Sequence, residues 1–149
     1  MSRIEKLREY LFNVIISLTN NSNFQINADM LSTKIGDYSL DKIPTDPIVE
    51  RWISGITRKR DLYSLRSRKA YSQDTINNLT NIGFFEEFEK KIKSNNDKGI
   101  LPEIDNIQTI ECLNCGSLNS VNGIQATFDI QIEITYIEKD TEEVSLWKK

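Results

Sequence analysis

The sequence predicts an α+β domain, in which two helices pack on one face of a mainly antiparallel sheet of four or five strands. Apolar and polar residues alternate without a break from Gln125 to Lys139, which is typical of a long strand with one buried face. Residues 2–19 and about 74–94 instead carry apolar residues at three- and four-residue spacing, as amphipathic helices do. These helices are expected to cover the apolar side of the sheet.

The first predicted helix begins with a capping box, because Ser2 and Glu5 stand three residues apart ahead of an apolar stripe. The stripe consists of Ile4, Leu7, Leu11, Val14, Ile15 and Leu18. The second helix is expected to follow an N-cap at Ser72 or Asp74 and to end near Ser94. Gly83 is a point at which this second helix can kink or split.

Several shorter segments predict further strands. Residues 24–26 suit a short strand, and residues 38–43 suit a short edge strand, because Pro44 and Pro47 cannot donate to a central ladder. Residues 48–71 are rich in strand-forming side chains and predict two strands with a turn or bulge near Gly55.

The region before the alternating strand predicts a hairpin. Residues 107–121 suit one long strand with a bulge at Gly116. Asn122 and Gly123 follow, and Asn-Gly favours the tight turn that joins two antiparallel strands. The strand at 107–121 is therefore expected to pair directly with the strand at 125–139.

Length and charge restrict the class of protein. A chain of 149 residues fits one domain, expected at residues 1–138, followed by a charged tail at 139–149. The formal net charge of −3 gives no general attraction to nucleic acid or to an anionic membrane. With no long apolar run and no apolar signal core, the protein is expected in the cytoplasm of the cell that makes it.

The residue types argue against an enzyme. The chain has no histidine, which removes imidazole as a general base, nucleophile partner or metal ligand. Cys112 and Cys115 form a CxxC, but one such pair supplies only half of a tetrahedral zinc site, and no redox helix follows it. We therefore expect no catalytic site, no cofactor and no resident metal; a metal shared between subunits is the alternative at the two cysteines.

A basic stripe and an acidic tail are the candidate interaction surfaces. On a strand Arg58, Arg60, Arg66 and Arg68 share one face. Three interpretations compete: a solvated face with screened ion pairs, a protein interface, and a nucleic-acid site. The tail offers the complementary residues for a contact with a neighbouring subunit. These are Glu138, Asp140, Glu142 and Trp147.

Several short segments follow one another in a characteristic order. They are DKIPT at 41–45, LYSLRSR at 62–68, FEEF at 85–88, LP at 101–102, IECL at 110–113 and FDIQI at 128–132. In this order the chain resembles the small minor capsid or tail terminator proteins of phages and prophages of Gram-positive hosts, and the likeness covers residues 1–138.

The resemblance implies a structural protein that caps the head-proximal end of the tail tube as a homo-hexameric ring. Such a ring stops tube growth and docks the neck; its partners are the tail tube, a sheath where the tail is contractile, and connector proteins. DNA passes through only if the particle has a head, and a headless tail-like bacteriocin is equally compatible. The alternatives are another head-tail connector or tail-completion protein and, from a different class, a nucleic-acid-binding module.

Overall fold

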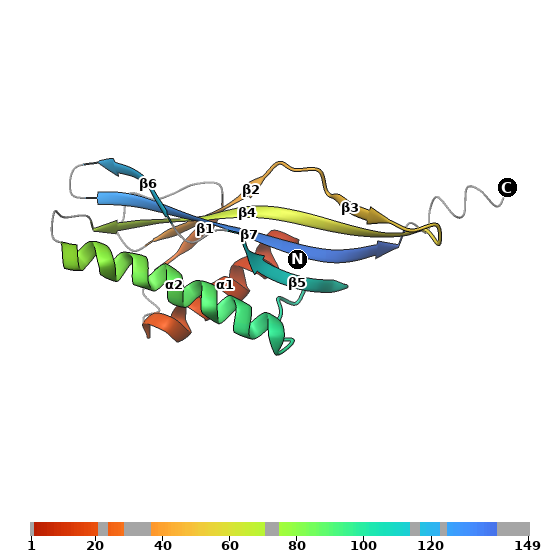
Figure 1. Ribbon diagram of the computed structural model, residues 1–149, viewed down its shortest axis with the longest axis horizontal. Coiled ribbons are helices and arrows are strands. Elements are labelled where there is room, and N and C mark those ends of the chain that lie inside the picture. Colours follow the sequence, from red (N-terminus) through yellow and green to blue (C-terminus); the bar gives the residue numbers. More distant parts are fainter. Residues whose placement is uncertain are drawn as a thin grey trace.

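The computed structural model confirms the α+β class: two helices cover one face of a mixed, mostly antiparallel open sheet (Figure 1). The structure describes residues 2–20, 24–28, 37–70, 75–113, 117–122 and 125–139. For residues 68–70, 75–82, 117–122, 125–127 and 139 it describes the backbone alone.

The helices are α1 (Arg3–Thr19) and α2 (Thr75–Asp97). The strands are β1 (Ile26–Ala28), β2 (Tyr38–Ile43), β3 (Ile48–Arg51), β4 (Ile56–Ala70), β5 (Ile107–Cys112), β6 (Ser117–Asn122) and β7 (Gln125–Lys139). The sheet runs in the order β1-β2-β4-β7-β5, with β3 also paired to β4 and β6 also paired to β7.

The two longest strands form the centre of the sheet. β4 and β7 have 15 residues each and pair antiparallel with no register shift, from Ile56 opposite Lys139 to Ala70 opposite Gln125. β2 and β3 share one edge of β4, and β5 and β6 share one edge of β7. In Figure 1 both helices lie below the sheet, and β3, β4 and β7 continue beyond them to the right.

The first helix is fixed by signals close together in the sequence. The predicted capping box is present: the Glu5 amide donates to the Ser2 hydroxyl and the Ser2 amide donates to the Glu5 carboxylate, each at 3.3 Å. At the other end Asn20 takes a left-handed conformation, with φ 53°, and stops the helix. Of the predicted stripe, Leu7, Leu11, Val14 and Ile15 are buried, and Ile4 and Leu18 at its ends are partly buried.

The core lies between the helices and the sheet. On β7 the inward residues are Phe128, Ile130, Ile132, Ile134 and Tyr136, as the alternation predicts. Phe85, Phe88 and Ile92 of α2 are fully buried against the core. Each such side chain contributes about 1.5–3 kcal/mol when it leaves water, so the helices and the sheet stabilise each other.

The described residues form seven strands where four or five were expected, and three further predictions about the elements need correction. β2 is not an edge strand, because β1 pairs parallel to its free side and Pro44 and Pro47 fall after it. The strand expected at 107–121 is two strands, although Asn122 pairs with Gln125 and so confirms the tight hairpin. α2 runs three residues past Ser94, and Gly83 does not split it.

Candidate functional site

The predicted basic stripe lies on the outer face, by which we mean the face of the sheet away from the helices. Tyr63 and Leu65 of β4 point toward the helices, so the even-numbered positions of this strand point away from them. Arg58, Arg60 and Arg66 therefore share the outer face. The unbroken register gives Arg68 the same face, and its side chain lies outside the described ones.

Each of the three described arginines of the stripe already has a carboxylate partner in its own subunit. Arg66 Nε donates to Asp41 Oδ2 at 2.6 Å. Arg58 lies 3.4 Å from a Glu50 carboxylate oxygen, and Arg60 lies 3.8 Å from one of Glu133. All three pairs are partly exposed, so each contributes on the order of 0–1 kcal/mol to stability.

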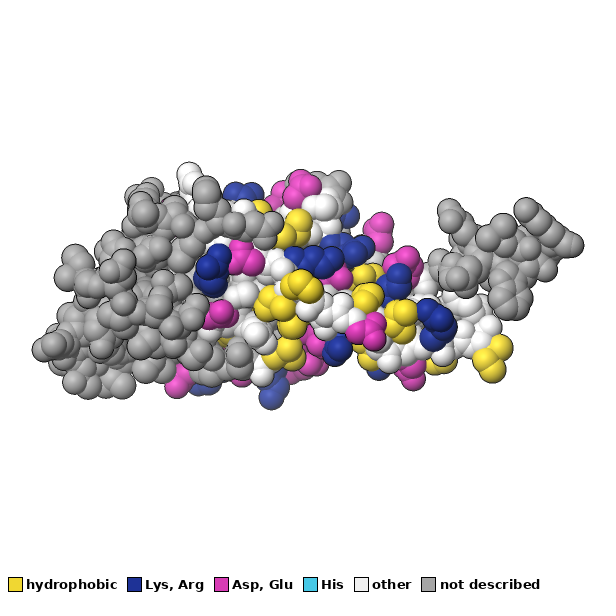
Figure 2. Space-filling view, turned by 90° about the horizontal axis from the view of Figure 1, so that it is seen from above, with side chains coloured by type: hydrophobic (Ala, Val, Ile, Leu, Met, Phe, Trp, Pro, Cys, Tyr) yellow, Lys and Arg dark blue, Asp and Glu magenta, His cyan; other side chains and the backbone are white. Residues whose placement is uncertain are grey.

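The outer face as a whole is not basic. Five carboxylates share the outer face of the described strands with the three arginines. They are Asp41, Glu50, Glu111, Asp129 and Glu133. Figure 2, seen from the side away from the helices, shows blue, magenta and yellow side chains intermixed. This mixture argues against the nucleic-acid interpretation, because a phosphate backbone is bound by a clear excess of positive charge.

The structure tests little of the predicted acidic tail. Glu138 forms an ion pair with Lys59, at 3.2 Å, within its own subunit. Asp140, Glu142 and Trp147 lie outside the described residues. The predicted contact between the tail and the stripe therefore stays a prediction.

An exposed apolar tip is the feature that the sequence analysis did not single out as a site. We call Ile48, Val49, Trp52 and Ile53 the apolar tip; they occupy β3 and the turn that joins it to β4. Their exposed fractions are 36%, 42%, 39% and 108%. Large apolar side chains left exposed close together in the chain make this tip a candidate contact surface. The sequence indicated the turn near Gly55 that these residues flank, but it did not show that their side chains stay exposed.

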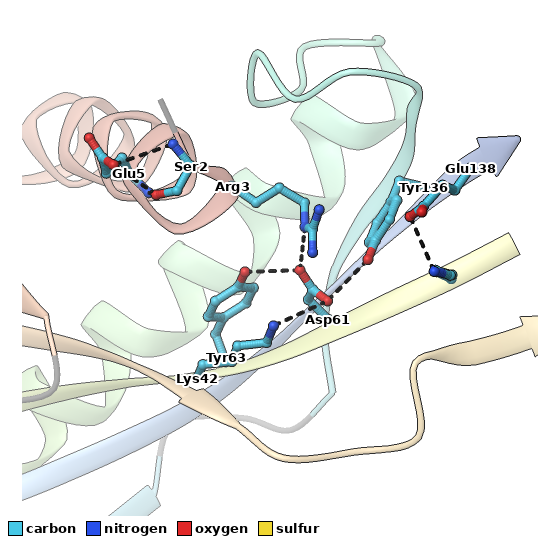
Figure 3. Close-up of polar contacts among 9 residues, drawn as sticks. Ser2, Arg3, Glu5, Lys42, Asp61, Tyr63, Tyr136 and Glu138 are labelled. Carbon is cyan, nitrogen blue, oxygen red and sulfur yellow. Dashed lines mark hydrogen bonds and ion pairs between the residues drawn. The ribbon is translucent and has the colours of Figure 1, made fainter. Parts of the chain in front are cut away.

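A second feature, which we call the Asp61 cluster, lies on the helix side of β4 (Figure 3). Asp61 is 3% exposed and accepts a hydrogen bond from Arg3 Nε at 2.7 Å. The hydroxyls of Tyr63 and Tyr136 donate to the same carboxylate at 3.1 Å and 3.3 Å, and Lys42 Nζ lies 3.8 Å away. The buried charge is therefore paired and hydrogen-bonded, as its burial requires.

The Asp61 cluster has an effect on the two phenols. Burial and the negative charge of Asp61 raise the pKa of Tyr136 to about 12, and the same two causes raise the pKa of Tyr63 above its ordinary value of 10.0. The Arg3 guanidinium also stacks on the Tyr136 ring, 4.6 Å from its centroid. The arrangement fixes the first turn of α1 over the sheet, because Arg3 of that turn contacts both Asp61 of β4 and Tyr136 of β7.

The cysteine pair offers no described metal site. Cys112 is half-buried and packs against the core, and Cys115 lies outside the described residues. Among the described residues no group of three or more histidine, cysteine, aspartate or glutamate side chains could hold a metal ion.

In the part of the chain that the structure describes, no helix is long and apolar enough to cross a membrane.

Comparison with known proteins adds no relative. No protein-family model matches the chain, and no curated protein matches it. The fold, the apolar tip and the charges of the outer face are therefore the observations on which a function has to be argued.

Proposed function

We propose that this chain is a structural subunit of a phage tail or phage-tail-like particle, in which it forms a ring of six at the head-proximal end of the tube. In this role it ends tube polymerisation and docks the neck. The single observation that carries the proposal is the apolar tip, which lies beyond the helices on the projecting end of the sheet. The resemblance over residues 1–138 gives the particular role.

A ring requires a specific kind of contact. In a closed ring one patch on each copy meets a different patch on the next copy, so the subunit must present two unlike surfaces. The apolar tip supports the first of these, because Ile53 is fully exposed and its neighbours on β3 and the turn are exposed with it. The tip is also held in place, since β3 pairs with β4 and Trp52 donates its amide to the Ile56 carbonyl at 2.9 Å.

The basic stripe supports an interface less well than the tip. Its described arginines are paired within the subunit, so a neighbouring carboxylate would replace an existing partner and would add little. A weaker role for Arg66 and Arg68 in assembly stays open to test by charge reversal. If reversing both charges leaves ring assembly unchanged, the stripe is not part of the interface.

Deletion of the gene tests the role of the protein. We expect tubes that grow beyond their normal length and lack an ordered cap, measured as tail lengths by electron microscopy. Tails of normal length would reject termination. Particles with tails of normal length that lack heads would instead place the protein at another position in the neck, and its copy number there would identify which.

Complementation of the deletion tests the apolar tip. Ile53→Asp is expected to give a folded protein that fails to restore normal tail length, because a charge at the tip opposes the contact. Ile100→Asp is the matched control, since Ile100 is also exposed but lies away from the tip in the loop after α2. Equal rescue by both variants would remove the tip from the interface.

A further inference from the structure

The apolar tip has an open side as well as exposed side chains. Among the described strands β3 pairs with β4 alone, so no described strand covers its other edge; the Ile48 amide donates to the Asp46 carboxylate at 3.1 Å. An exposed edge strand is a template for another chain; Glu50 and Arg51 charge the second half of β3, whereas Ile48 and Val49 leave its first half apolar and exposed. An apolar segment in an extended conformation is therefore the kind of partner that the tip would bind.

The place where the C-terminal segment begins points to that occupant. β7 ends at Lys139, which pairs with Ile56, the first residue of β4 after the turn that bears the tip. β7 runs outward there, past the ends of the helices (Figure 1). Residues 140–149 therefore start at the projecting end of the sheet and, when extended, reach about 33 Å.

The composition of residues 140–149 matches the tip. Val144, Leu146 and Trp147 provide large apolar side chains, and aromatic anchors of this kind dominate protein contacts. Before them stand Asp140, Glu142 and Glu143. At the tip Arg51 is exposed, with no ion pair to any of the described carboxylates, so the acidic residues find an available cation there.

We propose that residues 140–149 of one copy bind the apolar tip of the next copy, with Trp147 against Trp52 and Ile53. The inference rests on the proposed ring. The tail and the tip are the two unlike patches that a ring requires, because the tail of each copy binds the next copy and its tip binds the tail of the previous one. A tail that covered the tip of its own subunit would leave these surfaces unable to link the subunits.

Disulfide cross-linking tests the contact. In a Cys112→Ala/Cys115→Ala background, Ile53→Cys and Trp147→Cys are placed together in one chain, and the chain is expressed in the deletion strain and oxidised with copper phenanthroline. We expect a ladder of covalent oligomers on non-reducing gels that ends at the copy number of the ring and collapses on reduction. A chain with Ile100→Cys and Trp147→Cys is the matched control and should stay monomeric.

Other outcomes would overturn the proposal. A monomer of altered mobility, with a disulfide inside one chain, would show that the tail covers its own tip. The absence of any cross-link would reject the contact between the tail and the tip. Trp147→Ser in the otherwise unchanged chain introduces no cysteine, so it tests the contact apart from any effect of the cysteines on folding. Like Ile53→Asp, it should give overlong tails.

The test separates the contact from the function. If deletion gives overlong tails but no cross-linked ladder forms, termination is supported and the contact is rejected. If a ladder forms but deletion leaves tails of normal length, the contact is supported and termination is rejected.

Discussion

The two halves of the β4–β7 pair differ in what covers them. The half from Asp61 to Ser67 is covered by the helices, and Tyr63 and Leu65 are fully buried there. The half from Ile56 to Arg60 projects beyond the helices and carries β3 and the exposed Ile53. Backbone pairing is continuous through both halves, so the ladder itself does not distinguish them.

The difference separates stability from assembly. Apolar burial stabilises the covered half within one chain. At the end of the projecting half the side chains of the apolar tip stay in water, so their burial becomes available only when another surface arrives. Substitutions in the two halves should therefore affect different measurements, and the following predictions test this from the largest effect to the smallest.

The same substitution in the two halves should give the largest contrast. Ile132→Ala is expected to lower the free energy of unfolding by about 3–4 kcal/mol, because it removes a fully buried side chain and leaves a cavity. Ile53→Ala should change it by less than about 0.5 kcal/mol. Urea unfolding followed by circular dichroism measures both. A loss above 2 kcal/mol for Ile53→Ala would show that the tip is covered within the subunit.

Asp61, which lies where the two halves meet, should give the next largest effect. Asp61→Asn removes the charge that Arg3 and both tyrosine hydroxyls share, so we expect a loss of about 2–4 kcal/mol. Asp129→Asn on the outer face is the matched control; Asp129 accepts from Ser64 at 2.8 Å and should cost about 1 kcal/mol or less. Equal losses would contradict the assignment of the Asp61 cluster to the core.

The same cluster predicts how stability depends on pH. The folded protein raises the pKa of Tyr136 from 10.0 to about 12, so the stability from its neutral hydroxyl is present below pH 10. This stability should be lost as the pH rises from about 10 to 12. Midpoints of urea unfolding across this range measure the effect. Tyr136→Phe should flatten the decline, and an unchanged slope in that variant would assign it to other groups.

The smallest effect is expected on the outer face. A double-mutant cycle with Arg66→Ala and Asp41→Ala should give a coupling of about 0.5–1 kcal/mol, because both side chains are partly exposed. The coupling should shrink when salt is added. A coupling above 2 kcal/mol would mean that this pair belongs with the buried groups.

Elements with local signals could be predicted from the sequence. The bounds of β7 follow from its unbroken alternation, and the start of α1 follows from Ser2 and Glu5. The face that the arginines share was also predictable, because it depends only on the two-residue period of a strand. Their partners were not, since Asp41 and Glu133 lie on other strands.

The features that sequence reasoning missed depend on contacts between distant residues. Asp61 bonds to residues 58 and 75 positions away, and nothing near it in the sequence indicates either. Once it is known which face of β4 is buried, Asp61 is seen to share that face with Tyr63 and Leu65. A carboxylate on a buried face indicates a buried ion pair. The apolar tip was missed because exposure depends on where the helices end, which the pattern of one strand does not contain.

The central position of β7 has a consequence for how the chain folds. β7 follows every other described strand in the sequence, and its pairs with β4 join residues 55 to 83 positions apart. Pairing over such separations is slow, because a long loop must close before the contacts repay it. A chain emerging from the ribosome therefore leaves one edge of β4 without its partner until β7 appears. We expect the sheet to close late, only after β7 has been synthesised.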